Sequence, residues 1–252
     1  MTLRAVIFDL GHTIWDYAPS EAARRLSVVR LHQRLESSMS GDLPSPAALD
    51  RALGAAVERW LEYWRSDRLE QPPSEELVRE ALQAVAISPP DELLRELTSI
   101  FFGAELDILV VEPDTLAAIA TLHERGLVMG CITNTILLEE AIVDALRRLG
   151  LVRYLRSVVV SSAMGYGKPH PSLFRRALRE LNVSPREALF VGDRLVDDVS
   201  GAKGVGMRAV LTRQYRQEPL DGATALPDAV IRRLSELPDH LVQIEAKTRF
   251  QR

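Results

Sequence analysis

Four polar side chains in this sequence stand at, or shortly after, the end of an apolar run. They are two carboxylates, a hydroxyl and an ammonium group: Asp9, Thr133, Lys168 and Asp193. Continuous apolar runs are typical of parallel strands that are covered on both faces. In such a sheet, ligands bind at the carboxyl ends of the strands. We therefore expect these groups to share one cleft and to be suited to phosphate chemistry, with acids for a cation and donors for an oxyanion.

The elements that would position these groups alternate along the chain. The apolar runs predict strands at Ala5–Phe8, Leu127–Ile132, Val158–Val160, Ala188–Val191 and Ala209–Leu211. Helical spacing predicts helices over 114–125, 137–149, 171–181 and about 198–203, then a short strand at 228–231 and a short helix at 234–241. Alternation of this kind predicts an α/β protein with a doubly wound parallel sheet, a Rossmann-like core.

A helical insertion interrupts this alternation directly after the first strand. Amphipathic spacing predicts about four helices, over 21–35, 47–64, 74–85 and 91–102, with a cap-like opening of the third at Ser74. No strand pattern intrudes, so we expect an all-α helical bundle. The predicted domains are an α/β core at 1–15 and 109–252 and a helical domain at 16–108, with a loose polar tail at 244–252.

Composition narrows the function classes. The net charge is −4 and 46% of the residues are hydrophobic, which argues for a real core and against nucleic-acid binding. No run of 18 apolar residues occurs, so no membrane span is expected, and the early first strand leaves no room for a signal peptide. Cys131 is the single cysteine, expected as a small buried hydrophobe, and a cytoplasmic location fits. The oligomeric state is not indicated.

Four short motifs carry a resemblance to a known family. They are Asp9-Leu10-Gly11-His12-Thr13, Thr133-Asn134, Gly167-Lys168-Pro169, and Gly192-Asp193 with Asp198. In this order, each near a predicted strand end, they resemble the motifs of the haloacid dehalogenase superfamily. The helical insertion after the first motif is similar to the helical (C1-type) cap of that family. The resemblance covers the chain outside the insertion.

The resemblance implies a phosphatase-like mechanism that uses Mg²⁺. Asp9 would be the nucleophile and would form an aspartyl-phosphate, which splits one difficult step into two. Mg²⁺ prefers oxygen ligands, and Asp9, the backbone carbonyl of Gly11 and Asp193 would supply them. Asp198 would not bind the cation directly but would orient water or Lys168. We prefer Asp198 over its neighbour Asp197 because its spacing to the following Gly-Ala pair matches the family pattern.

The remaining motif residues would bind the phosphate. Thr133 would donate its hydroxyl, Asn134 would lie nearby with its amide, and Lys168 would stabilise the charges of nucleophile and phosphate. Lysine is rare in this arginine-rich chain, occurring at three positions, which makes Lys168 more noticeable. The expected activity is hydrolysis of small phosphomonoesters, and the expected partner is a small phosphorylated metabolite.

The first motif departs from the family pattern at one position. Phosphatases of this superfamily usually carry a second Asp, two residues after the nucleophile, that protonates the leaving group and then activates water. Here that position is Gly11. General acid–base catalysis is worth ~10²–10⁴-fold, so we expect slow catalysis, a good leaving group or a substitute. His12, with an unperturbed pKa near ~6.5, is the nearest substitute; its alternative is a loop histidine at the cap hinge.

Other functions stay open at this point. In a 2-haloacid dehalogenase Asp9 would attack carbon and displace halide without a metal, but Asp193 and Asp198 suggest a site built for a cation. Phosphonate cleavage through a cap lysine is disfavoured because the insertion contains no lysine. A catalytically weakened regulatory or binding member is the last alternative, with Gly11 as its first sign. The substrate itself is not readable.

Overall fold

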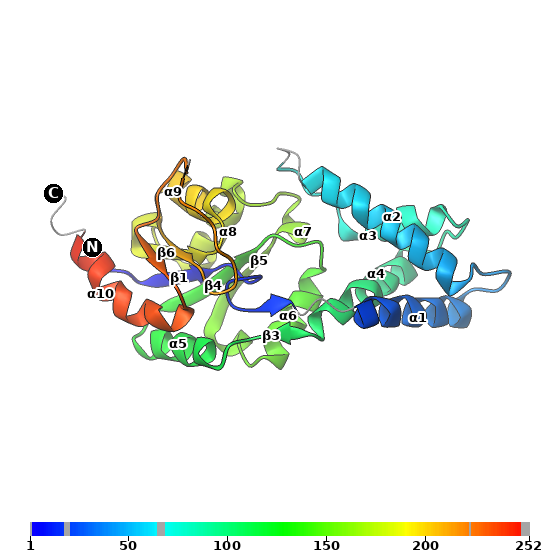
Figure 1. Cartoon of the computed structure of the whole chain (residues 1–252), viewed down its shortest axis with the longest axis horizontal. Coiled ribbons are helices and arrows are strands. Elements are labelled where there is room, and N and C mark those ends of the chain that lie inside the picture. Colours follow the sequence, from blue (N-terminus) through cyan, green and yellow to red (C-terminus); the bar gives the residue numbers. More distant parts are fainter. Residues whose placement is uncertain (1, 18–20, 65–68, 222, 248–252) are drawn as a thin grey trace.

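The computed structural model describes residues 2–17, 21–64, 69–221 and 223–247. Its centre is a six-stranded parallel sheet with the strand order β5-β4-β1-β6-β7-β8 (Figure 1). The strands are β1 (Ala5–Phe8), β4 (Val128–Thr133), β5 (Leu155–Val160), β6 (Ala188–Gly192), β7 (Arg208–Thr212) and β8 (Ala229–Ile231). This order confirms the predicted α/β fold class.

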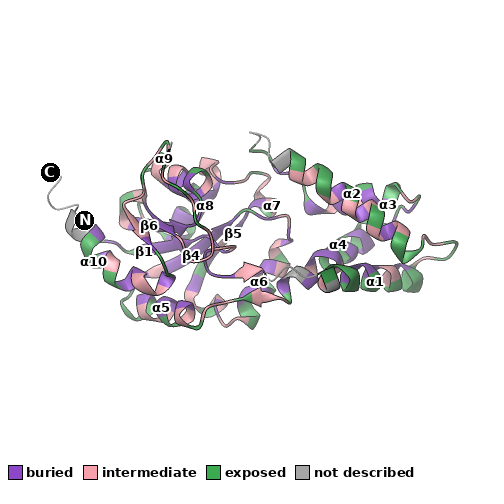
Figure 2. Ribbon diagram, in the orientation of Figure 1, coloured by how far each residue is buried: buried purple, intermediate pink, exposed green. Residues whose placement is uncertain are grey.

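Both faces of the sheet are covered, as the continuous apolar strands require. Alternate side chains of β1 point to opposite faces, so Val6 and Phe8 join one apolar cluster while Ala5 and Ile7 join the other. The first face packs against α5 (Pro113–Glu124), α6 (Glu139–Arg148) and α10 (Leu237–Lys247). The second packs against α8 (Pro171–Leu181) and α9 (Gly201–Gly204), with the short α7 (Ser161–Met164) following β5. In Figure 2 most of the central sheet is coloured as buried, and β1 and β6 are buried throughout.

The insertion forms a separate helical unit at one end of the molecule (Figure 1). Its helices are α1 (Glu21–Ser38), α2 (Pro46–Trp64), α3 (Ser74–Gln83) and α4 (Asp91–Leu106). Their inward faces are buried, with Leu31, Leu53, Leu77 and Leu97 fully enclosed, and their outer faces are exposed (Figure 2). At the border with the sheet, β2 (Asp16–Tyr17) pairs antiparallel with β3 (Leu109–Val110). This two-residue pair was not predicted.

The helical unit also docks on the core through main-chain hydrogen bonds. Leu69 accepts a hydrogen bond from Gly167 N–H and Gln71 donates its N–H to Gly165, each at 2.8 Å. Glu70 and Tyr166 form the antiparallel bridge between these bonds. The segment Leu69–Gln71, called the docked segment below, therefore contacts the main chain where the third motif begins.

Several details of the sequence prediction are corrected. Ser74 is not a capping residue: it is the first residue of α3, Pro73 holds the cap position, and the Ser74 hydroxyl donates to the carbonyl of Ile136. The tail is not loose from residue 244, because α10 continues to Lys247 and Ile244 is buried. The predicted helix near 198–203 is a π-helical turn, Leu195–Ser200, followed by α9. No helix in the described ranges is long and apolar enough to cross a bilayer.

Candidate active site

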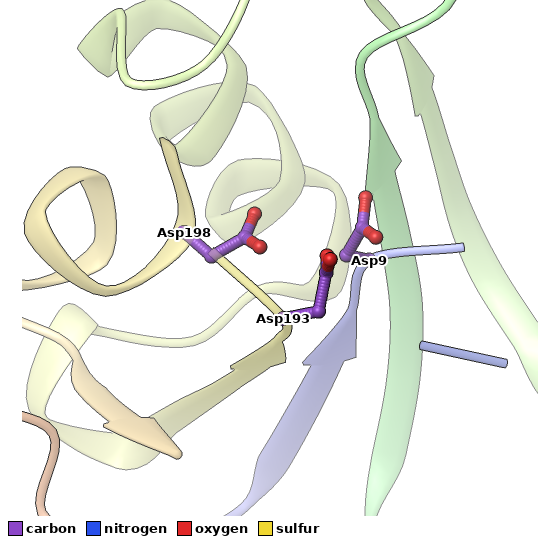
Figure 3. Close-up of side chains that lie close together, drawn as sticks. All are labelled: Asp9, Asp193 and Asp198. Atoms are coloured by element: carbon purple, nitrogen blue, oxygen red, sulfur yellow. The ribbon is translucent and has the colours of Figure 1, made fainter. Parts of the chain in front are cut away.

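The two carboxylates and the hydroxyl predicted at strand ends lie on adjacent strands. β1 is the central strand of the three, with Phe8 paired to Cys131 of β4 and to Val191 of β6. The residues that end or follow these strands, Asp9, Thr133 and Asp193, therefore reach the same edge of the sheet. All three are buried, and Figure 3 shows Asp9 and Asp193 close together with Asp198.

Lys168 lies between two of these carboxylates. Its Nζ donates to Asp9 Oδ1 and to Asp198 Oδ1, both at 2.6 Å, and its side chain is 2% exposed. Burial lowers the pKa of Lys168, but the charges of Asp198 and Asp9 outweigh burial and the net pKa is raised. The ammonium is therefore a fixed positive charge beside the candidate nucleophile.

The backbone of the fourth motif explains how Asp198 reaches this position. Its Oδ2 accepts a hydrogen bond from Arg194 N–H at 2.9 Å, across the π-helical turn. A Cβ at Gly192 would lie 2.3 Å from Asp198 Oδ2, so a side chain there would displace the carboxylate. The neighbouring Asp197 instead pairs with Arg194 Nε at 3.0 Å. The geometry thus favours Asp198 over Asp197 as the residue that orients Lys168.

The three carboxylates have the chemistry of a divalent cation site. Asp9, Asp193 and Asp198 each offer an oxygen, and these oxygens lie within 4.8 Å of one another. Burial raises the pKa of Asp9 to about 7, against the lowering effect of Lys168, and burial also raises the pKa of Asp193. Clustered, buried carboxylates need compensating positive charge. Asp198 accepts hydrogen bonds on both of its oxygens, from Lys168 and from the Arg194 N–H, whereas Lys168 contacts Asp9 at Oδ1. Asp9 and Asp193 are therefore the donors suited to Mg²⁺.

A positive side chain that the sequence did not single out contacts this cluster. Arg216, in the loop after β7, donates its Nε to Asp193 Oδ2 at 2.5 Å. The Arg216 side chain is 38% exposed, whereas that of Asp193 is 2% exposed. The guanidinium therefore reaches from the cleft onto a buried carboxylate.

The two residues of the second motif lie in different surroundings. Thr133 is buried as the last residue of β4, at the edge of the cleft. Asn134 clamps the main chain of Lys168: its Oδ1 accepts from Lys168 N–H at 2.7 Å and its Nδ2 donates to Lys168 O at 3.0 Å. The Asn134 side chain thus fixes the loop that carries Lys168, and its role as a phosphate ligand stays a prediction.

The first motif turns sharply after the nucleophile. His12 has a φ of 58°, and its Nδ1 is 2.8 Å from Asp16 Oδ1. A Cβ at Gly11 would lie 3.2 Å from Cε2 and 3.3 Å from the hydroxyl oxygen of Tyr17. The Tyr17 ring therefore occupies the space beside Gly11 into which a longer side chain would extend. Sequence reasoning missed Tyr17.

A cleft of about 550 Å³ connects these groups. It brings together every site residue that the sequence predicted: Asp9, Gly11, His12, Thr133, Asn134, Lys168, Asp193 and Asp198. Residues of the docked segment, of β2, of the fourth motif and of the loop after β7 complete its wall: Tyr17, Leu69, Glu70, Gln71, Arg194, Val196, Asp197 and Arg216. The cleft thus lies between the sheet edge and the helical unit. Arg65, Asp67 and Arg68 follow the second predicted helix and could reach the cleft or form a solvated face; the sequence favours the solvated face, and these residues lie outside the described ranges.

Comparison with known proteins agrees with this geometry. A family model described as haloacid dehalogenase-like hydrolase matches residues 3–206. A glyceraldehyde 3-phosphate phosphatase of Methanopyrus kandleri is 29% identical over 240 residues, covering 94% of this chain and 96% of its own length. A phosphoserine phosphatase of Thermus thermophilus is 37% identical over 169 residues, covering 66% and 64%.

Solved structures show the same fold. A 2-haloacid dehalogenase from Pseudomonas syringae pv. Tomato DC3000 superposes with a TM-score of 0.68 at 27% identity, covering 96% of this chain and 99% of that one. A HAD phosphatase from Thermococcus onnurineus gives a TM-score of 0.59 at 26% identity, covering 95% and 98%. The chain belongs to the haloacid dehalogenase-like hydrolases.

Proposed function

We propose that this protein is a Mg²⁺-dependent phosphatase that hydrolyses small phosphomonoesters through an aspartyl-phosphate. One observation carries the proposal: the Lys168 ammonium contacts Asp9 and Asp198 at 2.6 Å, in a buried cluster with Asp193. This arrangement supplies a nucleophile, a fixed cation and an acidic pair for a metal at one sheet edge. The phosphatase names of the relatives from Methanopyrus and Thermus support the same reaction class.

The residues divide the reaction between them. An Asp9 oxygen attacks phosphorus, the bond from phosphorus to the ester oxygen breaks, and that oxygen leaves with a proton as the alcohol. Water then attacks the aspartyl-phosphate, which releases inorganic phosphate and restores Asp9. Lys168 holds the Asp9 carboxylate in place and offsets charge on the phosphoryl group. Thr133 donates a hydrogen bond to a phosphoryl oxygen, and Asn134 keeps the Lys168 loop in position.

The cation site consists of side chains already described. Asp9 and Asp193, with the carbonyl of Gly11, would hold Mg²⁺. When bound, Mg²⁺ neutralises negative charge on the phosphoryl group and the nucleophile. Asp9 and Asp193 fit this requirement because both are buried and burial raises the pKa of each, so a bound cation would offset negative charge that burial disfavours.

Proton transfer is assigned to His12 in this proposal. Its ring lines the cleft, and the contact of Nδ1 with Asp16 Oδ1 at 2.8 Å leaves Nε2 as the nitrogen for exchange with the leaving group and water. Asp16 would orient the ring in the same way that a carboxylate orients a catalytic histidine elsewhere. Comparison of the pH–rate profile of the wild type with that of His12→Ala tests this role. An unchanged rate and profile would remove His12 from the chemistry.

The central test measures phosphate release from a chromogenic aryl phosphate with Mg²⁺ and with EDTA. We expect turnover that requires Mg²⁺ and is lost in Asp9→Asn. Turnover that survives Asp9→Asn would mean that Asp9 is not the nucleophile. A screen of phosphorylated metabolites then identifies the substrate, and the cytoplasmic location expected from the sequence stays a prediction.

Dehalogenation is the second candidate because the 2-haloacid dehalogenase of Pseudomonas syringae shares this fold at 27% identity. In that reaction Asp9 attacks carbon, the carbon–halogen bond breaks, and water hydrolyses the resulting ester. Halide release from 2-chloropropionate in EDTA, without phosphate release in Mg²⁺, would favour this function over ours. The cluster of Asp193 and Asp198 favours the phosphatase, because the dehalogenase reaction needs no metal.

A further inference from the structure

Arg216 holds the buried carboxylate that the proposed function assigns to the metal. Its Nε contacts Asp193 Oδ2 at 2.5 Å, and its half-exposed guanidinium lines the cleft. Burial of the Asp193 charge is unfavourable without a partner. The Arg216 guanidinium supplies that partner, because the Lys168 ammonium is already engaged by Asp9 and Asp198.

A divalent cation and a guanidinium cannot both neutralise one carboxylate at full strength. Both draw on the same negative charge, and their positive charges repel at this short range. Arg216 extends from the loop after β7 on a long, flexible side chain with one end in the cleft. It can therefore leave Asp193 without any movement of the sheet.

We propose that the Arg216 guanidinium exchanges one anionic partner for another. It pairs with Asp193 until the cation binds, and it then pairs with an anionic group of the substrate. This inference rests on the proposed function, since it assumes a cation at Asp193. A guanidinium pairs with phosphate or carboxylate through two parallel hydrogen bonds, so the displaced side chain has the chemistry to do this. Arg194, the other arginine in the cleft wall, follows Asp193 in the chain, but its guanidinium pairs with Asp197, and among the described residues the ion pair of Asp193 is with Arg216. The substrate class is therefore a phosphate ester whose phosphoryl group, or a second anionic group beside it, reaches Arg216.

The first experiment measures metal affinity directly. Mg²⁺ is titrated by calorimetry into the wild type, Arg216→Gln and Arg194→Gln, each with folding checked by circular dichroism. Loss of a charge-assisted contact that competes with the cation should tighten Mg²⁺ binding of Arg216→Gln by about tenfold. Arg194→Gln removes the same charge from the same cleft and is the matched control, for which we expect about twofold or less.

The outcomes separate direct competition from a general field effect. Equal tightening in both variants would overturn the proposal, because the cause would be net charge rather than the contact with Asp193. Unchanged or weaker Mg²⁺ binding in Arg216→Gln would also overturn it. Arg216→Met serves as a second variant of similar length, from which the same tightening is expected.

The second experiment tests the anion-binding half. Inorganic phosphate is titrated into each protein at saturating Mg²⁺, and Arg216→Gln should bind it about tenfold more weakly than the wild type. Unchanged phosphate affinity would refute this half of the proposal. The two failures are distinguishable: tighter Mg²⁺ with weaker phosphate binding in Arg216→Gln supports the exchange even if no phosphate ester is turned over, a result that would overturn only the proposed function.

Discussion

Replacement of the nucleophile should stabilise the metal-free protein. Asp9 is buried beside two other carboxylates, and burial raises its pKa to about 7 from an ordinary value of 3.8. Since one pKa unit corresponds to about 1.4 kcal/mol, ionisation of Asp9 in the folded state costs up to about 4 kcal/mol at alkaline pH. Asp9→Asn removes this charge and keeps an oxygen that can accept from Lys168. We expect the free energy of unfolding to rise by about 2–4 kcal/mol at pH 8.

The stability gained in Asp9→Asn should increase as the pH rises. Because the folded pKa lies above the unfolded one, the folded wild type keeps its proton on Asp9 between about pH 4 and pH 7, where the unfolded chain has lost it. The contribution of Asp9 to stability is therefore present below about pH 4 and is lost as the pH rises through 7. The advantage of Asp9→Asn should be largest at pH 8 and small at pH 4.

Urea denaturation in EDTA, followed by circular dichroism at both pH values, measures this difference. Asp50→Asn is the matched control, because Asp50 is a half-exposed carboxylate paired with Arg24 and should change stability by about 0.5 kcal/mol or less. Added Mg²⁺ should stabilise the wild type more than Asp9→Asn, since the variant lacks one metal ligand. If Asp9→Asn proves less stable than the wild type at pH 8, or equally advantaged at pH 4, our account of the buried charge is wrong.

Three further predictions follow from other parts of the structure. Gly11→Asp alone should add little activity, because its Cβ would lie 3.2 Å from the Tyr17 ring. The double variant Gly11→Asp with Tyr17→Ala should raise kcat for an alkyl phosphate at least about tenfold over the wild type, and equal kcat values in the double variant and the wild type would show that the missing acid is not limiting. Burial raises the pKa of the Cys131 thiol, so a thiol reagent at pH 8 should label it only after unfolding, and rapid labelling of the native protein would contradict the buried strand. Hydrogen bonds from the Ser184 N–H and hydroxyl hold the pKa of Glu187 at about 2, so the stabilising effect of the Glu187 carboxylate is present above pH 4.5 and is lost toward pH 2. Ser184→Ala should raise the pKa of Glu187, and an unchanged value in a carboxyl NMR titration would show that the Ser184 hydroxyl does not lower it.

The sequence predicted most of the sheet and the strand-end part of the cleft for one physical reason. A buried parallel strand must be apolar throughout, so the polar residue that follows it is visible in the sequence, as at Asp9 and Thr133. Lys168 is not at a strand end, and its place was indicated by the motif around it. Its contacts with Asp9 and Asp198 are a product of the fold.

The residues that were missed carry no such mark. Arg216 is one arginine among many in an irregular loop, and only the three-dimensional path of that loop brings it to Asp193. Tyr17 belongs to a strand pair of two residues, which is too short to show alternation. Ser74 illustrates the opposite error, because a local helix-start pattern indicated a cap where the hydroxyl is instead used in a contact with Ile136.

The seam between Leu69–Gln71 and Gly165–Gly167 is made by main-chain groups, with two N–H donors and two carbonyl acceptors. Bonds of this kind use no side-chain atom, although Gly165, with a φ of 70°, has a left-handed backbone conformation that favours glycine. Glu70 lies between these two bonds and also lines the cleft, so a substitution at this position changes the cleft wall while the main-chain donors and acceptors on either side stay in place. The rim of the cleft can thus diversify through single substitutions at a position whose backbone holds the two parts of the molecule together.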